Sequence, residues 1–382
     1  MEQIHDRVAG LDVRRDQVAV CVRTPGPRGG VHMDKARFDT TAGGLAALAE
    51  WLAGQAVALA AMEATGVYWK PVYYALEGRL EVWLCNAHHV KNVPGRKTDM
   101  SDAEWLADVA AHGMVRPSFV PPPPIRELRE LTRYRKTQID VRAAEIARLE
   151  KVLQDAGIKL TSVASKVLTQ SGRAIIEALI AGQRDPAALA GLAKGSLRGK
   201  VPELTAALHG FVTDHHRFQL RMLLRQAEHL EGLIAAYAAR IEAVMAPFAA
   251  AAGRLETIPG LGAKAAEAIV AEIGTDMAKF PSAGHLASWA GLCPGNDQSA
   301  GKRRSGKTTK GSQWLRTVLV QVAWAASHTK ETVFAATYRK WARRLGKKKA
   351  LVALGHKILV GIYKLLKDRT DYRERGSPAK VA

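Results

Sequence analysis

The apolar run AVALAAME at residues 56–63 constrains the fold most, because no polar residue interrupts it before the final glutamate. Short continuous runs of this kind are typical of strands that are buried on both faces of a sheet. The run therefore predicts a strand in the interior of a sheet, within a domain of the α/β class.

The residues around this run alternate between strand and helix patterns up to about residue 115. The runs VAGLDV and QVAVCVRT predict a hairpin, and VHMDKARFDT predicts a third strand. Thr41 is a candidate N-cap for the helix AGGLAALAEWLA, and Pro71 falls in the first turns of the helix GVYWKPVYYALEG. LEVWLCN predicts another strand and SDAEWLADVAAHG another helix. The order β-β-β-α-β-α-β-α is that of an RNase H-like domain, which we expect over residues 1–118.

The run PPPP at residues 121–124 is a stiff spacer, after which the pattern becomes helical. Residues 125–155 and 213–248 each carry an apolar stripe at helical spacing, and a shorter helical insert separates them. We expect residues 119–252 to form a linker and an antiparallel coiled-coil arm, with ordinary bundle helices as the alternative. Residues 253–382 predict a mostly helical C-terminal domain.

Four carboxylates lie where an RNase H-like fold would place metal ligands, namely Asp12, Glu63, Asp99 and Asp102. Hard divalent cations prefer oxygen ligands, and such cations can activate a phosphodiester. The four acids therefore predict a site for Mg²⁺, with Mn²⁺ as an alternative. A plainer interpretation makes Asp12 a turn residue and the later acids partners of a helix dipole.

The start of the last helix in this region can be interpreted in two ways. If Thr98 is the N-cap, Asp99 and Asp102 lie one turn apart on one helix face. If Ser101 and Glu104 form a capping box, Asp99 lies just outside the helix. The sequence leaves both open.

The charge of the chain is strongly uneven. Residues 300–382 hold 21 Lys or Arg and 4 Asp or Glu, so they carry +17 of the total net charge of +20. The clusters at 301–311 and 339–350 predict contact with nucleic acid, against the alternative of solvated helix faces. The three cysteines are far apart and predict no zinc site. The longest apolar stretch is short, so we expect a cytoplasmic, nucleoid-associated protein without a membrane span.

The run IPGLG at residues 258–262 predicts a helix-hairpin-helix element. Gly260 and Gly262 would let the backbone approach a partner closely, and Lys264 follows at the start of the next helix. Backbone N–H groups at such a helix start can hold a phosphate without reading base sequence. A glycine turn between two packed helices would give the same pattern.

The segment AGLCPGNDQSAGKRRSGKTTKGSQWLR at residues 290–316 combines hydroxyl groups with a dense run of cations. A serine becomes a useful nucleophile only when a base or nearby cations activate it. Ser299 is the candidate nucleophile, with Ser305 and Ser312 as rivals. The cations expected to contact nucleic-acid phosphates here are Lys302, Arg303, Arg304, Lys307 and Lys310.

These motifs together resemble the transposases of the insertion sequence 110 family, which are DEDD-type, bridge-RNA-guided recombinases. The resemblance rests on GLD at 10–12, MEATG at 62–66, KTDMSDA at 97–103, TIPGLG at 257–262 and the segment 290–316. It implies a RuvC-like domain, a coiled coil and a C-terminal transposase domain. It also implies that Asp12, Glu63, Asp99 and Asp102 bind Mg²⁺, and that Ser299 attacks DNA to leave a covalent phosphoserine.

The resemblance further implies partners. These are donor and target DNA, a guide RNA encoded beside the gene, and further copies of the chain in a dimer or tetramer whose subunits share composite sites. Two other hypotheses stay open on the residues alone. One is a metal-dependent DNA endonuclease or junction resolvase that uses water as the nucleophile. The other is a nucleic-acid-binding protein without catalysis.

Overall fold

The structure is a computed structural model. It describes residues 3–26, 30–93, 101–294, 297–299, 301–305, 308 and 310–374, with the backbone alone at 297–299 and 303–305. The chain divides into two compact units, Met1–Val120 and Pro121–Ala382. The arm and the C-terminal domain expected from the sequence both fall in the second unit, so their boundary stays a prediction.

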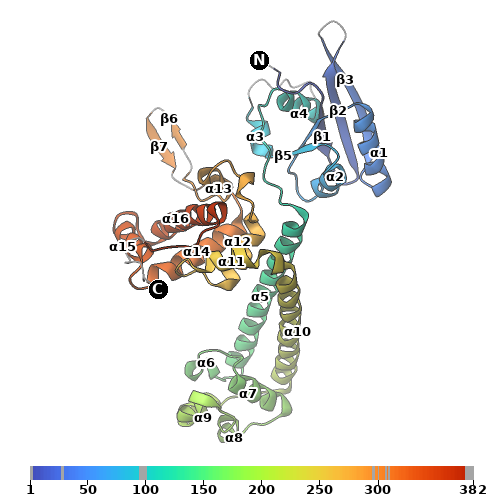
Figure 1. The fold of residues 1–382 in the computed structure, drawn as a ribbon. Helices are drawn as coiled ribbons and strands as arrows, with labels where there is room; N and C mark the ends of the chain where they lie inside the picture. The colour runs from blue at the N-terminus through green and yellow to red at the C-terminus, as the bar shows by residue number, and fades with distance from the viewer. Residues whose placement is uncertain are drawn as a thin grey trace. The chain divides into compact units, whose positions relative to one another are not determined.

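The first unit is a mixed sheet of five strands with helices on both faces (Figure 1). Its strand order is β3-β2-β1-β4-β5, in which β1, β2 and β3 pair antiparallel and β1, β4 and β5 pair parallel. The elements in chain order are β1 (Val8–Val13), β2 (Gln17–Pro25), β3 (Val31–Asp39), α1 (Ala42–Gly54), β4 (Leu59–Glu63), α2 (Trp69–Leu76), β5 (Glu81–Cys85), α3 (Ala87–Lys91) and α4 (Asp102–Ala111).

Local signals in the sequence explain most of these boundaries. Thr41 is the N-cap of α1, and its hydroxyl accepts a hydrogen bond from the backbone N–H of Gly44 at 3.2 Å. The strand predicted from residue 56 begins only at Leu59, because Ala56 takes a left-handed φ of 50° in the turn after α1. The strand and helix predictions for this unit are otherwise confirmed, with the short helix α3 in addition.

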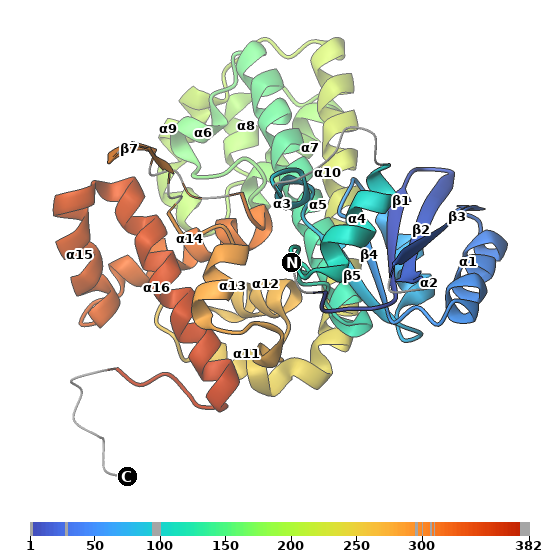
Figure 2. The same ribbon diagram turned by 90° about the horizontal axis from the view of Figure 1, so that it is seen from above.

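The two faces of the sheet pack against different helices. Leu11 and Met62 belong to a core with α1 and α2, whereas Val8 and Ala61 belong to a second core with α4. Figure 2 shows β1 between α4 and α1. Because side chains alternate along a strand, every second residue of β1 and β4 faces α4.

In its described residues, the second unit is helical except for one hairpin. Its first elements are α5 (Pro123–Asp155), α6 (Leu160–Val163), α7 (Gln170–Ala181), α8 (Pro186–Ala190), η2 (Gly195–Lys200), α9 (Val201–Ala207), α10 (Asp214–Met245) and η3 (Ala246–Phe248). They are followed by α11 (Ala249–Glu256), α12 (Ala263–Ile273), η4 (Met277–Lys279), α13 (Ala283–Trp289), β6 (Asp297–Ser299), β7 (Lys302–Ser305), α14 (Gln313–His328), α15 (Val333–Leu345) and α16 (Lys347–Asp368).

The long helices α5 and α10 lie side by side and run antiparallel (Figure 1). Near the start of α5, Glu127 pairs with Arg240 at the far end of α10. At the end of α5, the carboxylate of Asp155 lies 3.0 Å from Nε2 of His216, at the beginning of α10. The insert α6–α9 packs on the end where α5 stops, around a core that includes Leu153. The sequence correctly predicts the two helices and their antiparallel pairing.

One helical segment in the described part of the chain, Asp214–Glu256, is long and apolar enough to cross a membrane by length and composition. Its most apolar window has a mean hydropathy of 1.4. Length and composition are weak evidence for a span. The segment also packs along α5 and carries Glu231, which pairs with Arg142 and Arg173.

Candidate functional site

Asp12 and Glu63 directly follow the last paired residues of two neighbouring parallel strands. Leu11 of β1 is paired with Met62 of β4, and each of the two carboxylate residues is the next residue along its strand. Parallel strands in register hold such residues about 4.8 Å apart, with both side chains on the same face of the sheet. That face is the one covered by α4, because it is also the face of Ala61.

Helix α4 runs antiparallel to β1 across this face. Near the N-terminus of the chain, the backbone N–H of Ile4 donates to the carbonyl oxygen of Ala111, at the end of α4. Farther along β1, a Cβ atom built on Gly10 would lie 2.0 Å from the carbonyl oxygen of Ala103, in the first turn of α4. The first residue of α4, Asp102, is therefore at the carboxyl end of β1, where the two strand carboxylates lie.

The start of α4 is fixed by a capping box. The Ser101 hydroxyl accepts from the N–H of Glu104 at 3.3 Å, and the Glu104 carboxylate accepts from the N–H of Ser101 at 3.0 Å. Of the two possibilities left open by the sequence, the capping box is confirmed. Lys35 on β3 forms an ion pair with Glu104 and so helps to hold this helix start, a contact that local sequence patterns do not predict.

The immediate surroundings of the acidic residues are partly polar. Asp12 is partly exposed and pairs with the guanidinium of Arg14 at 3.2 Å. Glu63 is in register with Cys85 of β5. Burial, together with the negative charge of Glu63, raises the pKa of the Cys85 thiol to about 12, so the thiol is uncharged at neutral pH.

The predicted set of four acids is not complete in the described part of the chain. Asp99 lies outside the described residues. Among the residues that are described, no group of three or more His, Cys, Asp and Glu is close enough to hold a metal ion. The structure thus brings part of the predicted set to one edge of the sheet. This part consists of Asp12, Glu63 and Asp102, the last at the start of α4.

In the second unit, the IPGLG run forms the turn between α11 and α12. Gly260 has a φ of 83°, and a Cβ atom there would lie 2.4 Å from the backbone nitrogen of Ala326 on α14. This glycine is therefore required for close helix packing. Gly262 is exposed, precedes the first turn of α12 and has nothing within 4 Å of a built Cβ atom. Lys264 is exposed and pairs with Glu267 at 3.0 Å.

Ser299 is the last residue of β6, at the turn of the β6–β7 hairpin. Its backbone is paired with Lys302, and Gly301 in the turn has a φ of 76°. Lys302 and Lys310 are exposed. For Arg303, Arg304 and Ser305 only the strand position in β7 is described, and Lys307 lies outside the described residues.

Ser312, a rival candidate for the nucleophile, has a different place. It is the N-cap of α14, and its hydroxyl accepts from the N–H of Leu315 at 3.2 Å. The same hydroxyl donates to the carboxylate of Glu272 at 2.9 Å. A hydroxyl held by two partners in a helix cap is poorly placed to attack a phosphate.

Comparison with known proteins adds to this geometry. A family model described as "Transposase", built on DEDD-type insertion sequence 110 proteins, matches residues 9–158. A second model, described as "Transposase IS116/IS110/IS902 family", matches residues 252–339. The first range includes all four acidic residues, and the second includes the glycine turn, the hairpin and the basic loop.

Individual relatives match parts of the chain. The pilin gene-inverting protein of Moraxella bovis is 31% identical over 131 residues, which are 32% of this chain and 39% of that protein. A probable family 20 transposase of Pseudomonas aeruginosa is 25% identical over 237 residues, 61% of this chain and 60% of that protein. An uncharacterized IS110 insertion element protein of Streptomyces coelicolor is 30% identical over 129 residues, 33% of this chain and 31% of that protein.

The matches thus span from 31% to 60% of the length of these relatives. The two family models, however, fall on either side of residues 159–251, and together they cover more than half of the chain. The chain therefore belongs to the IS116/IS110/IS902 family of transposases.

Proposed function

We propose that this chain is a transposase that cuts and rejoins DNA through a covalent phosphoserine at Ser299. The observation that carries this proposal is the register of β1 and β4, which sets Asp12 beside Glu63 at the edge where α4 begins. The family models over both units and the name of the gene-inverting relative support DNA rearrangement as the reaction.

We assign the metal site to Asp12, Glu63, Asp99 and Asp102. The donor set fits Mg²⁺, because carboxylate oxygens are its usual protein ligands and two of the carboxylates lie on one face of the sheet. A divalent cation bound there would supply electrostatic polarisation of the scissile phosphate. The strand order β3-β2-β1-β4-β5 supports an RNase H-like, or RuvC-like, domain as the scaffold.

In the proposed reaction the Ser299 oxygen attacks phosphorus. A bond between that oxygen and phosphorus forms while the bond from phosphorus to the leaving deoxyribose oxygen breaks, and the serine proton ends on the leaving oxygen. The phosphoserine ester keeps the energy of the broken bond, so rejoining needs no ATP. The position of Ser299 at the hairpin turn, two residues before Gly301, supports it as the nucleophile, and the neighbouring cations would stabilise the charge on phosphate.

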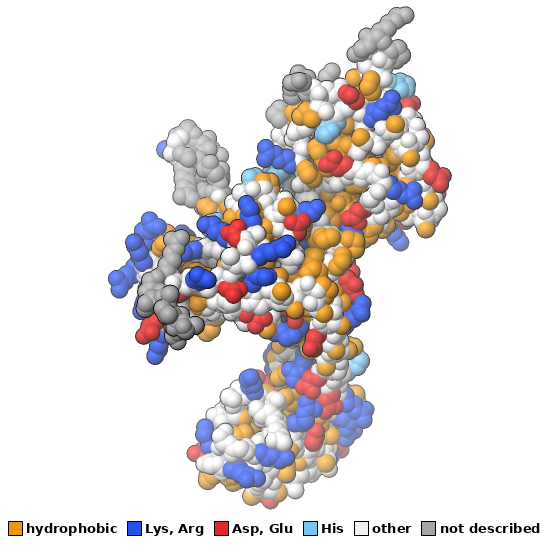
Figure 3. Space-filling view, in the orientation of Figure 1, with side chains coloured by type: hydrophobic (Ala, Val, Ile, Leu, Met, Phe, Trp, Pro, Cys, Tyr) orange, Lys and Arg blue, Asp and Glu red, His pale blue; other side chains and the backbone are white. Residues whose placement is uncertain are grey.

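The partners proposed are donor and target DNA, a guide RNA, and further copies of this chain. Exposed cations on α15 and at the start of α16 support polyanion binding, and Figure 3 shows Lys and Arg side chains gathered around α15. Antiparallel pairing of α5 with α10 supports a coiled-coil arm that could join subunits. A cytoplasmic, nucleoid-associated location fits a protein that acts on DNA.

The decisive experiment incubates the full chain with its flanking RNA, donor DNA and Mg²⁺, and then separates products under denaturing conditions. We expect a protein–DNA adduct that Ser299→Ala abolishes and Ser305→Ala, on the paired strand, leaves intact. Loss in Ser305→Ala alone would move the nucleophile to that residue. Cleavage without any adduct would favour a metal-dependent nuclease that uses water.

Two control reactions complete the experiment, one without the RNA and one without Mg²⁺. Adduct formation that is unchanged without the RNA would contradict the guide-RNA part of the proposal. Binding of DNA without any metal-dependent product would favour a nucleic-acid-binding protein without catalysis.

A further inference from the structure

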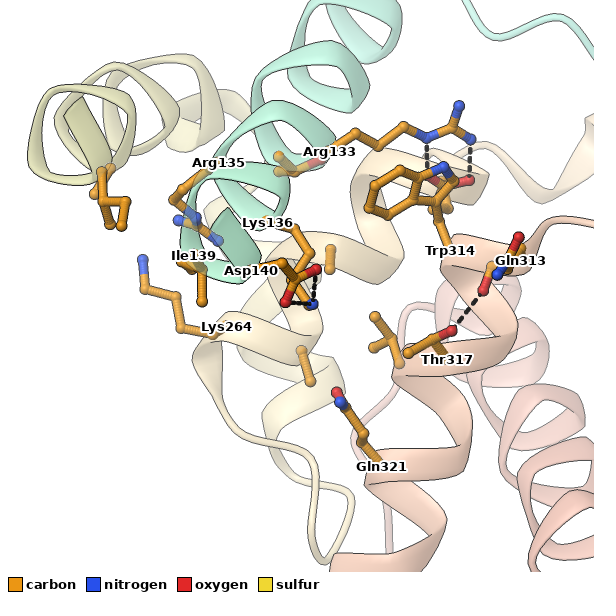
Figure 4. A pocket seen from close by; sticks show the side chains of 17 residues that line it. Arg133, Arg135, Lys136, Ile139, Asp140, Lys264, Gln313, Trp314, Thr317 and Gln321 are labelled. Atoms are coloured by element: carbon orange, nitrogen blue, oxygen red, sulfur yellow. Dashed lines mark hydrogen bonds and ion pairs between the residues drawn. The ribbon is translucent and has the colours of Figure 1, made fainter. Parts of the chain in front are cut away.

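A buried carboxylate, Glu272, joins three separate elements of the second unit. Its side chain is 3% exposed and lies in the last turn of α12. The guanidinium of Arg133 on α5 donates to both of its oxygens, at 2.7 and 2.8 Å. The Ser312 hydroxyl at the start of α14 donates to one of them at 2.9 Å. Figure 4 shows Arg133 making the two bonds beside the ring of Trp314.

The same region carries a second arginine from the arm. Arg129 on α5 donates to the backbone carbonyls of Ala271 and Glu272, at the end of α12. Carbonyls at a helix end lack intrahelical partners and carry partial negative charge, so the guanidinium stabilises this end. A buried carboxylate is costly unless it is paired and hydrogen-bonded. Here Arg133 and the Ser312 hydroxyl donate to it, and Nε of Arg129 lies 4.0 Å from one of its oxygens.

Ser312 is the point at which the basic loop returns to the helical body. Just before it, Gly311 packs so closely on the preceding helix end that a Cβ atom there would lie 2.3 Å from the nitrogen of Gly291. Just after it, Arg316 donates to the carbonyl of Gly291 at 2.5 Å. Farther out, Pro294 and Thr308 form an isolated bridge. The two ends of the segment that contains the β6–β7 hairpin are therefore in direct contact with each other.

We infer that Glu272 is a positioning residue for the Ser299 hairpin, which it ties to arm helix α5 through its bonds to Ser312 and Arg133. This inference rests on the proposed function of Ser299. The carboxylate touches no substrate. It acts by holding Ser312, and so the returning end of the loop, at a fixed place relative to α5.

Substitutions at position 312 separate this role from simple helix capping. Ser312→Asp keeps an excellent N-cap but cannot donate to Glu272 and repels it, whereas Ser312→Thr keeps both the cap and the donor. We expect Ser312→Asp to slow adduct formation by roughly tenfold or more, because a hydrogen bond to a buried charge is lost. We expect Ser312→Thr to form the adduct at close to the unsubstituted rate, and DNA affinity to change little in either variant.

A reciprocal change tests the contact itself. Combining Ser312→Asp with Glu272→Gln moves the negative charge across the contact and restores a donor, since the glutamine amide can donate to the aspartate while its oxygen keeps one of the two bonds from Arg133. We expect the double variant to recover much of the rate that Ser312→Asp loses. A double variant no faster than Ser312→Asp would overturn the inference, as would a Ser312→Asp variant equal to the unsubstituted chain.

Hydrogen–deuterium exchange of peptides spanning residues 297–312 gives a readout that does not depend on catalysis. We expect faster exchange in Ser312→Asp, and slower exchange again in the double variant. If the unsubstituted chain forms no adduct, the proposed function fails, and exchange alone then decides the positioning role. Equal exchange in Ser312→Asp, Ser312→Thr and the unsubstituted chain would refute it.

Discussion

At the scale of single residues, the candidate metal site is organised by the backbone. The pairing of Leu11 with Met62 decides that Asp12 and Glu63 face the same way, whatever their side chains contact. Asp12 forms an ion pair with Arg14, whose side chain is 75% exposed. Exposed pairs contribute only about 0.2–1 kcal/mol, so Asp12 can exchange this partner for a cation at little cost.

The first prediction concerns these carboxylates. Asp12→Asn and Glu63→Gln should each abolish DNA cleavage and joining while leaving DNA and RNA affinity nearly unchanged, because neither side chain is in the core. The measurements are product yield with Mg²⁺ and dissociation constants from filter binding. Asp16→Asn is the matched control, since that acid is 88% exposed and lies outside the register. Full recombination by Asp12→Asn would contradict the metal-site assignment.

At the scale of elements, α4 approaches β1 closely in the first unit. Gly10 leaves no room for a side chain, because a Cβ atom there would meet backbone atoms of both Ala103 and Ala107, at 2.0 and 2.5 Å. Backbone cannot move aside as a flexible side chain can. The start of α4, and with it Asp102, is therefore placed by the absence of a side chain two residues before Asp12.

The second prediction follows from this packing. Gly10→Ala should destabilise the protein by about 1–3 kcal/mol or more, as overpacking does, and should also reduce catalysis by shifting α4. Gly43→Ala is the control, because nothing lies within 4 Å of a Cβ atom at that exposed position in α1. It should stabilise the helix by up to about 1 kcal/mol. Urea unfolding of both variants gives the comparison, and equal midpoints would disprove the close packing.

At the scale of the whole molecule, the charge is divided between the two halves of the sequence. The acids of the candidate site are in the first 102 residues, whereas residues 300–382 carry +17. Exposed cations on α15 include Arg339, Lys340, Arg343 and Arg344. A polyanion therefore has its main attraction to the part of the chain that follows the serine loop.

The third prediction tests this division. Arg343→Gln combined with Arg344→Gln should weaken binding and reduce the slope of log affinity against log salt by roughly two, at about 0.9 per phosphate contact with duplex DNA. The measurement is DNA affinity over a range of salt concentrations. Arg148→Gln, on the arm and 60% exposed, should leave the slope unchanged. An unaltered slope in the double variant would mean that these arginines only solvate a helix face.

Sequence patterns predicted the elements of this protein better than the contacts between them. The alternation in β1 and β2 and the cap at Thr41 are local signals, because they depend on neighbouring residues alone. The sequence allowed two N-caps for α4, and only the structure identifies the capping box at Ser101. Asp99 stays a prediction, and so does the chemical role of every site residue.

Contacts between distant residues had no local signal. Glu272 reads as an ordinary helix acid, and its partner Arg133 is 139 residues away. Gly10 reads as a strand glycine, yet its role depends on a helix that begins at Asp102. Both roles depend on tertiary contacts, which periodicity and capping rules do not describe.

The antiparallel arm has a consequence for how this chain tolerates change in length. Because α5 and α10 run in opposite directions, the segment between them leaves and returns at the same end of the pair. Residues 156–213 can therefore grow, shrink or be replaced by another small module without altering where α11 starts relative to α5. The arm makes that segment a natural place for relatives to diverge, and a practical attachment point for a reporter domain.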